Sequence, residues 1–220
     1  MSAIADPDVA VVPDSIPPIV AGIAERGYAV AAGALPDATV AALRTRARAL
    51  DAAGALAPAH VGRGASRDLR ADVRGDRIRW LDPGAADPAE AEPLAFLDAL
   101  RVACNRALMA GLAEFEGHYA LYPPGARYAR HRDRFRDDDA RVLSCVLYLN
   151  ERWQPADGGA LRVYVDRATT IDVTPTGGTL VAFLSDAFEH EVLPATRPRI
   201  ALTGWFRRRP LARGTRGGAC

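Results

Sequence analysis

The second half of the chain is a succession of short β-type runs, and this succession constrains the fold more than any other feature of the sequence. The runs recur from His118 onward, and turn sequences at residues 123–125, 157–159 and 175–178 separate them. Short runs bounded by glycine and proline clusters are typical of strands. We therefore expect a β core in this half of the chain.

The first half is predicted to be mainly helical. Apolar residues recur at three- and four-residue steps over residues 16–26 and 37–53, which predicts two amphipathic helices, the second with Asp37 as its N-cap. Residues 88–112 predict a third helix, interrupted at Pro93. Two short strands are also expected, at residues 27–30 and 77–80.

Together these patterns predict an α+β protein, a double-stranded β-helix (jelly roll, cupin-like) buttressed by N-terminal helices. A chain of 220 residues suits one domain with a sizeable core. We divide this single domain, residues 1–220, into mainly helical support over residues 1–113 with a loop at about 62–75, a catalytic β core over residues 114–207, and a basic tail over residues 208–220.

Two histidines and one aspartate in the β-type half form a candidate metal site. His131 and Asp133 are two residues apart, so on a strand both side chains would point to the same face. His190 lies in a short strand-like run, residues 189–193, that is expected beside the first strand. Two imidazoles and one carboxylate form the facial triad of non-haem Fe(II) oxygenases. The alternative is an ion pair in a loop between His131 and Asp133, with His190 as a surface histidine.

Arg199 is predicted to anchor a dicarboxylic co-substrate. Its planar guanidinium can bind a carboxylate through two parallel hydrogen bonds, and it never loses its charge. In this interpretation Arg199 holds the far carboxylate of 2-oxoglutarate. Thr203 lies four residues later on the same strand face, where its hydroxyl can add a contact. Ordinary β-propensity is the competing explanation for this threonine.

Composition narrows the classes of partner and location. A formal net charge of +1 gives no general case for binding nucleic acid or a membrane. All 28 basic residues are arginine, which suggests a GC-rich bacterial genome. Cys104, Cys145 and Cys220 are too few and too scattered for a disulfide framework or a zinc site, so we expect a reducing cytoplasm. We expect no signal peptide and no transmembrane helix, and we interpret the basic tail as solvated.

Seven blocks of sequence, in order along the chain, resemble the 2-oxoglutarate-dependent prolyl hydroxylases of the oxygen-sensing, hypoxia-factor (EGL-nine) type. The resemblance runs from about Gly75 to Phe206, over more than half of the chain. The blocks are residues 74–80, 122–133, 148–150, 158–164, 185–186, 190–192 and 199–206. This resemblance implies that Fe(II), 2-oxoglutarate and O2 are needed, with ascorbate as a candidate reductant.

The resemblance also implies roles for individual residues around the co-substrate. Tyr122 matches the tyrosine that shares the far carboxylate of 2-oxoglutarate with Arg199, and Tyr148 matches another tyrosine that lines the same pocket. Each tyrosine has a competing explanation as a core aromatic whose hydroxyl found a partner.

On the side of the target, the resemblance implies four substrate-binding residues and a loop. Asp76 and Arg141 match a pair that ties the substrate loop to the barrel, although the sequence alone would make them ordinary surface charges. Trp80 and Trp205 match residues near the target-binding face, with simple packing as the alternative. Residues 62–75 match a segment that folds over a peptide substrate.

The implied function is hydroxylation of a proline, at the 4-position, in a protein loop. For a bacterial member of the family, elongation factor Tu is the leading candidate target. Residues 134–139 depart from the family pattern directly after the metal motif, which leaves the substrate open. Two alternatives remain: hydroxylation of a free amino acid or small metabolite, which predicts turnover without any peptide, and a non-catalytic binding module, which predicts no iron binding.

Overall fold

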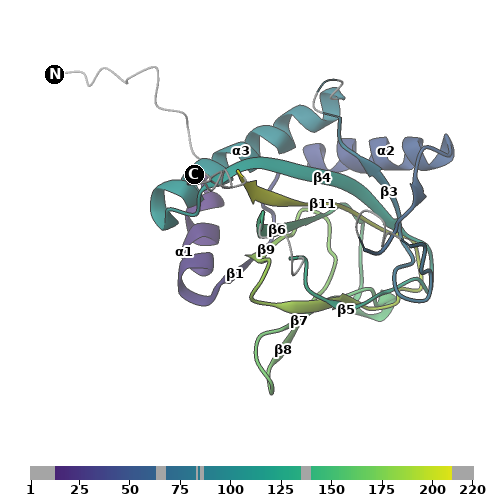
Figure 1. Cartoon of the computed structure of the whole chain (residues 1–220). Coiled ribbons are helices and arrows are strands. Elements are labelled where there is room, and N and C mark those ends of the chain that lie inside the picture. Colours follow the sequence, from purple (N-terminus) through teal and green to yellow (C-terminus); the bar gives the residue numbers. More distant parts are fainter. Residues whose placement is uncertain (1–12, 63–67, 83, 85–86, 135–139, 210–220) are drawn as a thin grey trace, which may run out of the picture.

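Two antiparallel sheets face each other in the computed structural model, which describes residues 13–62, 68–82, 84, 87–134 and 140–209. The large sheet has the strand order β1-β9-β6-β11-β4-β3-β2, and the small sheet has the order β5-β10-β7-β8 (Figure 1). The strands are β1 (Tyr28–Ala31), β2 (Ala57–Pro58), β3 (Arg77–Trp80), β4 (Leu112–Tyr122), β5 (Tyr128–His131), β6 (Arg141–Tyr148), β7 (Leu161–Tyr164), β8 (Thr170–Val173), β9 (Leu180–Leu184), β10 (Glu189–Val192) and β11 (Arg199–Arg208). The predicted double-stranded β-helix is confirmed.

The helices cover the face of the large sheet that is turned away from the small sheet (Figure 1). They are α1 (Ile16–Arg26), α2 (Asp37–Ala52) and α3 (Pro88–Leu108), and a short 3-10 helix, η2 (Pro155–Asp157), follows β6. One hydrophobic cluster joins the three α-helices to the large sheet, and a second lies between the two sheets. The buttressing by N-terminal helices is therefore as predicted.

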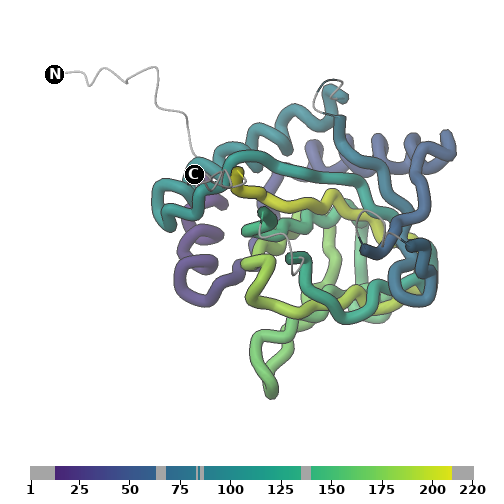
Figure 2. The backbone as a smooth tube through the Cα atoms, viewed as in Figure 1, coloured from purple at the N-terminus to yellow at the C-terminus, as the bar shows by residue number. Residues whose placement is uncertain are grey.

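Strands β4 and β11 are far apart in the sequence but lie side by side in the middle of the large sheet (Figure 2). On β4, Tyr119 and Leu121 belong to the cluster under the helices, while Ala120 and Tyr122 belong to the cluster between the sheets. Successive side chains of a strand point to opposite faces, and this explains the division. The same alternation on β11 turns every second side chain toward the interior between the sheets.

The boundaries of the first two helices are close to those predicted. Helix α1 covers the predicted residues, and α2 ends one residue earlier than expected. The prediction of Asp37 as N-cap is wrong, because Asp37 is the first helical residue and Pro36 precedes it without a side-chain cap. The preference for aspartate extends into the first helical turn, where its charge favours the positive end of the helix dipole.

Two predictions about the third helix are wrong. Helix α3 continues through Pro93, and it ends at Leu108 rather than at Leu112. Met109 and Gly111 adopt left-handed backbone angles, with φ of 50° and 68°, which turn the chain out of the helix. Leu112 then begins β4, so the β-type half starts six residues before His118.

The predicted loop and tail are only partly described. Residues 63–67 and 210–220 lie outside the described residues. The end of the loop pairs with β5, because Ala129 N–H donates to Val73 O at 2.8 Å and Gly75 N–H donates to Arg127 O at 2.9 Å. Strand β11 includes the first residue of the predicted tail. No described helix combines the length and apolar character that crossing a membrane requires.

Candidate active site

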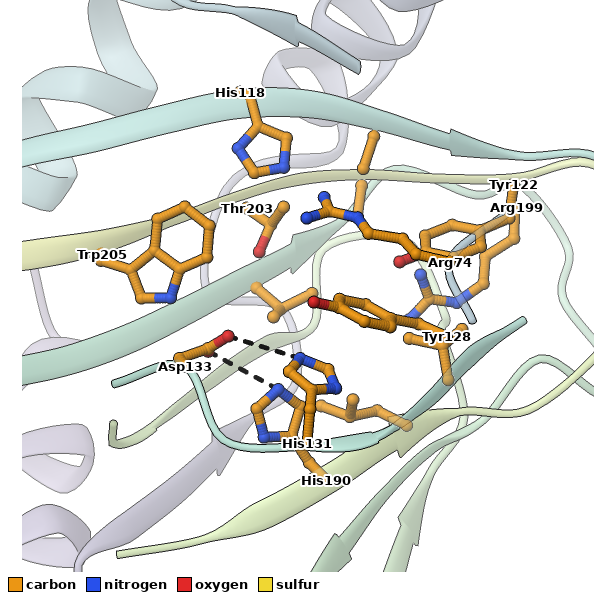
Figure 3. Close-up of a pocket in the computed structure, with 15 residues that line it drawn as sticks. Arg74, His118, Tyr122, Tyr128, His131, Asp133, His190, Arg199, Thr203 and Trp205 are labelled. Carbon is orange, nitrogen blue, oxygen red and sulfur yellow. Dashed lines mark ion pairs between the residues drawn. The ribbon is translucent and has the colours of Figure 1, made fainter. Parts of the chain in front are cut away.

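His131, Asp133 and His190 come together where β5 and β10 pair. The two histidines lie directly opposite each other in the ladder, so the third ligand comes from a neighbouring strand, as predicted. Nε2 of each imidazole lies 3.5 Å from a carboxylate oxygen of Asp133, and one ligand atom from each residue lies within 4.8 Å of the others (Figure 3). Asp133 itself lies in the bend after β5, so the prediction that it shares a strand face with His131 is wrong. The three side chains nevertheless converge.

Backbone carbonyl groups orient both imidazoles. Nδ1 of His131 lies 2.8 Å from the carbonyl oxygen of Ala129, and Nδ1 of His190 lies 3.4 Å from that of Phe188. A proton on Nδ1 leaves Nε2 as the free lone pair, and both Nε2 atoms face Asp133. The histidines are therefore arranged to bind a metal through Nε2.

The carboxylate of Asp133 is also held in place. The hydroxyl of Ser144 donates to its Oδ2 at 2.7 Å, and Ser185 lies 2.9 Å from Ser144. Burial opposes ionisation, but His190, His131 and the Ser144 hydrogen bond together keep the pKa of Asp133 below its usual value. Burial lowers the pKa of His190 to about 4. At neutral pH Asp133 is therefore ionised and His190 is neutral, which is the state that metal binding requires.

A β-bulge in β5 brings a tyrosine against the metal site. His190 pairs with His131, and Val192 pairs with Tyr128. One residue lies between the two paired positions on β10, whereas two residues lie between them on β5, so β5 carries one extra residue. Such an extra residue re-aims the side chains around it. The ring of Tyr128 stacks on His131 with a centroid distance of 3.6 Å, and the guanidinium of Arg74 lies 4.8 Å from the Tyr128 ring. Through Tyr128, Arg74 at the end of the predicted loop is thus connected to His131, a candidate metal ligand.

The triad opens into a cavity between the sheets, which we call the inner cavity. Its lining residues are Arg74, His118, Ala120, Tyr122, Tyr128, His131, Asp133, Val146, Leu161, His190, Val192, Arg199, Ala201, Thr203 and Trp205. Arg199 is 2% exposed, and its Nε–H donates to Gly159 O at 2.9 Å. Its Nη2 has no hydrogen-bond partner among the described residues. A buried guanidinium with a free nitrogen in a cavity is suited to a carboxylate, so this site fits 2-oxoglutarate.

The predicted companions of Arg199 differ in position. Tyr122 lines the inner cavity, and its ring centroid lies 5.2 Å from the guanidinium carbon. Tyr148 lies 5.0 Å from the same carbon but is outside the cavity lining. Thr203 lines the cavity on the same strand as Arg199, and its hydroxyl donates to Cys145 O at 3.1 Å. Tyr122 and Thr203 therefore border the cavity as predicted, whereas Tyr148 contacts Arg199 from outside the lining, so the prediction that it lines the pocket is wrong.

A second cavity of about 280 Å³, the outer cleft, adjoins the first at the metal ligands. Its lining includes His131, Asp133 and Arg141, together with Trp80 and Trp205, which are 42% and 6% exposed. The guanidinium of Arg141 lies 3.4 Å from the Trp205 ring centroid. The outer cleft thus brings together three of the four predicted substrate-binding residues.

The fourth such residue, Asp76, has a different partner from the one predicted. Arg74 binds its carboxylate through two parallel hydrogen bonds of 2.7 and 3.0 Å, and Asp76 is 2% exposed. Arg141 instead contacts Glu116 at 3.6 Å and the ring of Trp205. The predicted pairing of Asp76 with Arg141 is therefore wrong, and Arg74 ties this segment to the inner cavity.

Arg74, Tyr128 and His118 line the inner cavity without having been assigned a role from the sequence. The bulge hides Tyr128, because strict alternation along β5 would separate it from His131. His118 could have been found, since it precedes Tyr122 by four residues and so shares its strand face.

The sequence profile of the 2OG-Fe(II) oxygenase superfamily matches residues 117–207, which include all three candidate metal ligands and Arg199. The human protein Egl nine homolog 1 is 35% identical over 149 residues, which cover 63% of this chain. The chain spans about a third of the length of that relative, 34%.

Two solved structures are similar over most of the chain. A Pseudomonas putida prolyl-4-hydroxylase is 50% identical with a TM-score of 0.80, and the match covers 88% of this chain and 99% of that one. A prolyl hydroxylase from Trichoplax adhaerens, solved with a peptide fragment of the oxygen degradation domain of hypoxia inducible factor, is 26% identical with a TM-score of 0.77. That match covers 87% of this chain and 88% of the other. The similarity therefore extends over the helices as well as the β core.

Proposed function

Because the chain belongs to the 2-oxoglutarate- and Fe(II)-dependent oxygenases, and within them to the EGL-nine-type prolyl hydroxylases, we propose that it hydroxylates a prolyl residue, at the 4-position, in a protein substrate. The observation that carries this proposal is the inner cavity, which has the three ligand side chains and the buried guanidinium of Arg199 in one lining. Iron, 2-oxoglutarate and O2 supply the oxidising chemistry when they are bound there.

In this proposal the residues of the chain bind the metal, orient 2-oxoglutarate and shield both from water. His131, Asp133 and His190 would hold the metal at the edge of the cavity. Arg199 fixes the far carboxylate of 2-oxoglutarate, with Tyr122 and Thr203 beside it and Tyr148 behind. Because Arg199 is buried, its interaction with a carboxylate is weakly screened by water, which favours a dicarboxylate in one fixed orientation.

The outer cleft supports a protein substrate rather than a small one. Trp80, which is 42% exposed, offers a flat apolar surface beside the candidate metal ligands, and such a surface suits a pyrrolidine ring. Arg141 and Asp76 are placed to hold the wall of the cleft, Arg141 against Trp205 and Asp76 through Arg74. The peptide-bound Trichoplax adhaerens enzyme supports this assignment by its similar fold.

Elongation factor Tu is the first protein that we propose to test as the target, on the basis of the resemblance alone. A cytoplasmic location is part of the same proposal, and it rests on the few, scattered cysteines. The competing proposal, a free amino acid or small metabolite, would require hydroxylation without any peptide.

The test is a search for the modified protein. The full chain is incubated with Fe(II), 2-oxoglutarate and a bacterial lysate, and tryptic peptides are searched for a gained oxygen atom that is absent with the His131→Ala variant. A modified proline supports the proposal and identifies the target, and purified elongation factor Tu tests the named candidate directly. Succinate formation without any modified peptide would favour the small-molecule alternative.

A further inference from the structure

The roof of the inner cavity carries a histidine that the proposed function does not use. His118 on β4 lies opposite Thr203 on β11 and opposite Trp80 on β3. Its imidazole is 1% exposed and lines the cavity together with Thr203 and Trp205 (Figure 3). The ring centroid lies 4.7 Å from that of Trp80 and 5.5 Å from that of Trp205. The two indoles lie 6.3 Å apart, so the imidazole packs with both of them in one aromatic cluster at the cavity wall.

Three ring nitrogens of this roof have no hydrogen-bond partner in the part of the chain that the structure describes. Neither ring nitrogen of His118 has a hydrogen-bond partner among the described residues, and the same is true of Nε1 of Trp205. Thr203 donates its hydroxyl to Cys145 O instead. An apolar side chain would fill the same space without burying two unpaired polar atoms, so packing does not account for an imidazole here.

The imidazole is neutral, and this limits what it can bind. Burial lowers the pKa of His118 well below 6.5, and the positive charges of Arg74 and Arg141 lower it further, against a smaller opposing effect of Asp133. A neutral imidazole has one N–H donor and one acceptor nitrogen. A carboxylate or carbonyl oxygen could pair only with the N–H, whereas a water molecule can pair with either ring nitrogen and can also accept from the indole N–H of Trp205.

We propose that His118 is a positioning residue that binds a water molecule at the roof of the inner cavity, and that this water passes a hydrogen bond to the 2-oxoglutarate bound there. A bridging water can replace a direct hydrogen bond at little enthalpic cost. This inference rests on the proposed use of the cavity for 2-oxoglutarate and is independent of the protein target.

The first test measures co-substrate affinity. 2-Oxoglutarate is titrated calorimetrically into the Mn(II)-loaded full chain. His118→Leu, which removes both hydrogen-bonding atoms, is expected to weaken binding by about threefold to tenfold. His118→Gln, which keeps a donor and an acceptor, is expected to stay within about twofold of the wild type. The matched control is Tyr119→Phe, which removes a buried hydrogen bond to Glu90 on the opposite face of β4 and should leave the affinity unchanged.

The second test is a high-resolution crystal structure of the wild-type protein with Mn(II) and 2-oxoglutarate. A water within hydrogen-bond distance of His118 supports the proposal, and two dry ring nitrogens overturn it. Wild-type affinity in a folded His118→Leu variant also overturns it, and His118→Met serves if the leucine variant does not fold. If the wild-type protein binds no 2-oxoglutarate, the proposed function of the cavity fails, and no water then bridges His118 to it.

Discussion

At the scale of single residues, the buried charge of Arg199 restricts what the site can bind more than any other group does. A guanidinium keeps its charge, so burying it without an anion is unfavourable. The carbonyl of Gly159 satisfies its Nε–H, but Nη2 has no partner among the described residues. A carboxylate in the inner cavity would give Nη2 a partner, so we expect Arg199 to contribute to affinity for 2-oxoglutarate rather than to metal binding.

Replacing Arg199 should therefore separate co-substrate binding from metal binding. Arg199→Ala is expected to weaken 2-oxoglutarate binding by at least about 30-fold, because truncating one member of a buried charge pair costs about 2 kcal/mol or more. Mn(II) affinity should be unchanged, and both quantities are measured by calorimetry. Arg197→Ala is the matched control, since Arg197 lies two residues before Arg199 but contacts Asp157 at the surface. Wild-type turnover of 2-oxoglutarate in Arg199→Ala would refute the anchor assignment.

The hydrogen bond from Ser144 to Asp133 leads to a prediction about metal affinity. Its hydroxyl orients Asp133, so Ser144→Ala is expected to reduce metal affinity about 10-fold to 100-fold, the usual effect of losing a group that orients a ligand. Competition for Mn(II) with a chelator of known affinity measures this. Ser185→Ala removes the contact with Ser144 but leaves the hydrogen bond to Asp133, so a smaller loss is expected. Equal losses in the two variants would mean that Ser144 does not act through Asp133.

Individual residues of the site were predictable to different extents. The triad and Arg199 could be found because their chemistry is specific and each lies on or next to a short β-type run. The partner of Asp76 could not be found, because the sequence does not show which arginine reaches its carboxylate: Arg74 does, while Arg141 contacts Glu116. Tyr128 was hidden because a bulge changes the alternation of β5.

At the scale of elements, helix α3 is defined by its caps rather than by its composition. Asp87 accepts a hydrogen bond from Ala89 N–H, and Glu90 accepts one from the backbone of Asp87. Glu90 also accepts a hydrogen bond from the hydroxyl of Tyr119 on β4. The beginning of α3 is thus tied to the large sheet that carries the site. Its end at Leu108 was mispredicted because Met109 gives no sequence signal for a left-handed backbone angle.

The cap of α3 should matter for stability but not for the site. Asp87→Ala is expected to lower the free energy of unfolding by about 1 kcal/mol, because it leaves a helical N–H without its partner. Asp37→Ala is the control, since Asp37 makes no cap hydrogen bond and a smaller loss is expected. Urea unfolding measures both, and calorimetry should show unchanged 2-oxoglutarate affinity. A loss as large in Asp37→Ala would contradict this account of capping.

At the scale of the whole molecule, two hydrophobic layers have separate tasks. The layer between the helices and the large sheet contains the larger hydrophobic cluster, with Glu90 buried beside it, whereas the layer between the sheets includes the buried ionisable groups of the site. The overall architecture was predictable because strand periodicity and turn positions follow directly from the sequence. The pairing of strands across the two sheets was not, because register depends on contacts between distant segments.

The burial of ionisable groups between the sheets predicts how the stability of the fold depends on pH. Folded His190 has a pKa of about 4, and in the unfolded chain a histidine titrates near 6.5. Between these values the unfolded state binds more protons, so the free energy of unfolding of the metal-free protein should rise with pH. His190 alone contributes up to about 3 kcal/mol over this interval. His118, whose pKa is also lowered, acts in the same direction.

Urea unfolding from pH 4.5 to 7 measures this dependence. Asp133 contributes in the same sense at lower pH, because its depressed pKa adds stability that is lost as the carboxylate is protonated. His190→Gln cannot bind the proton and should flatten the profile. Saturating Mn(II) should steepen it, because the metal and protons compete for the same nitrogen. A metal-free protein whose stability is flat or falls between pH 4.5 and 6.5 would show that burial does not control His190.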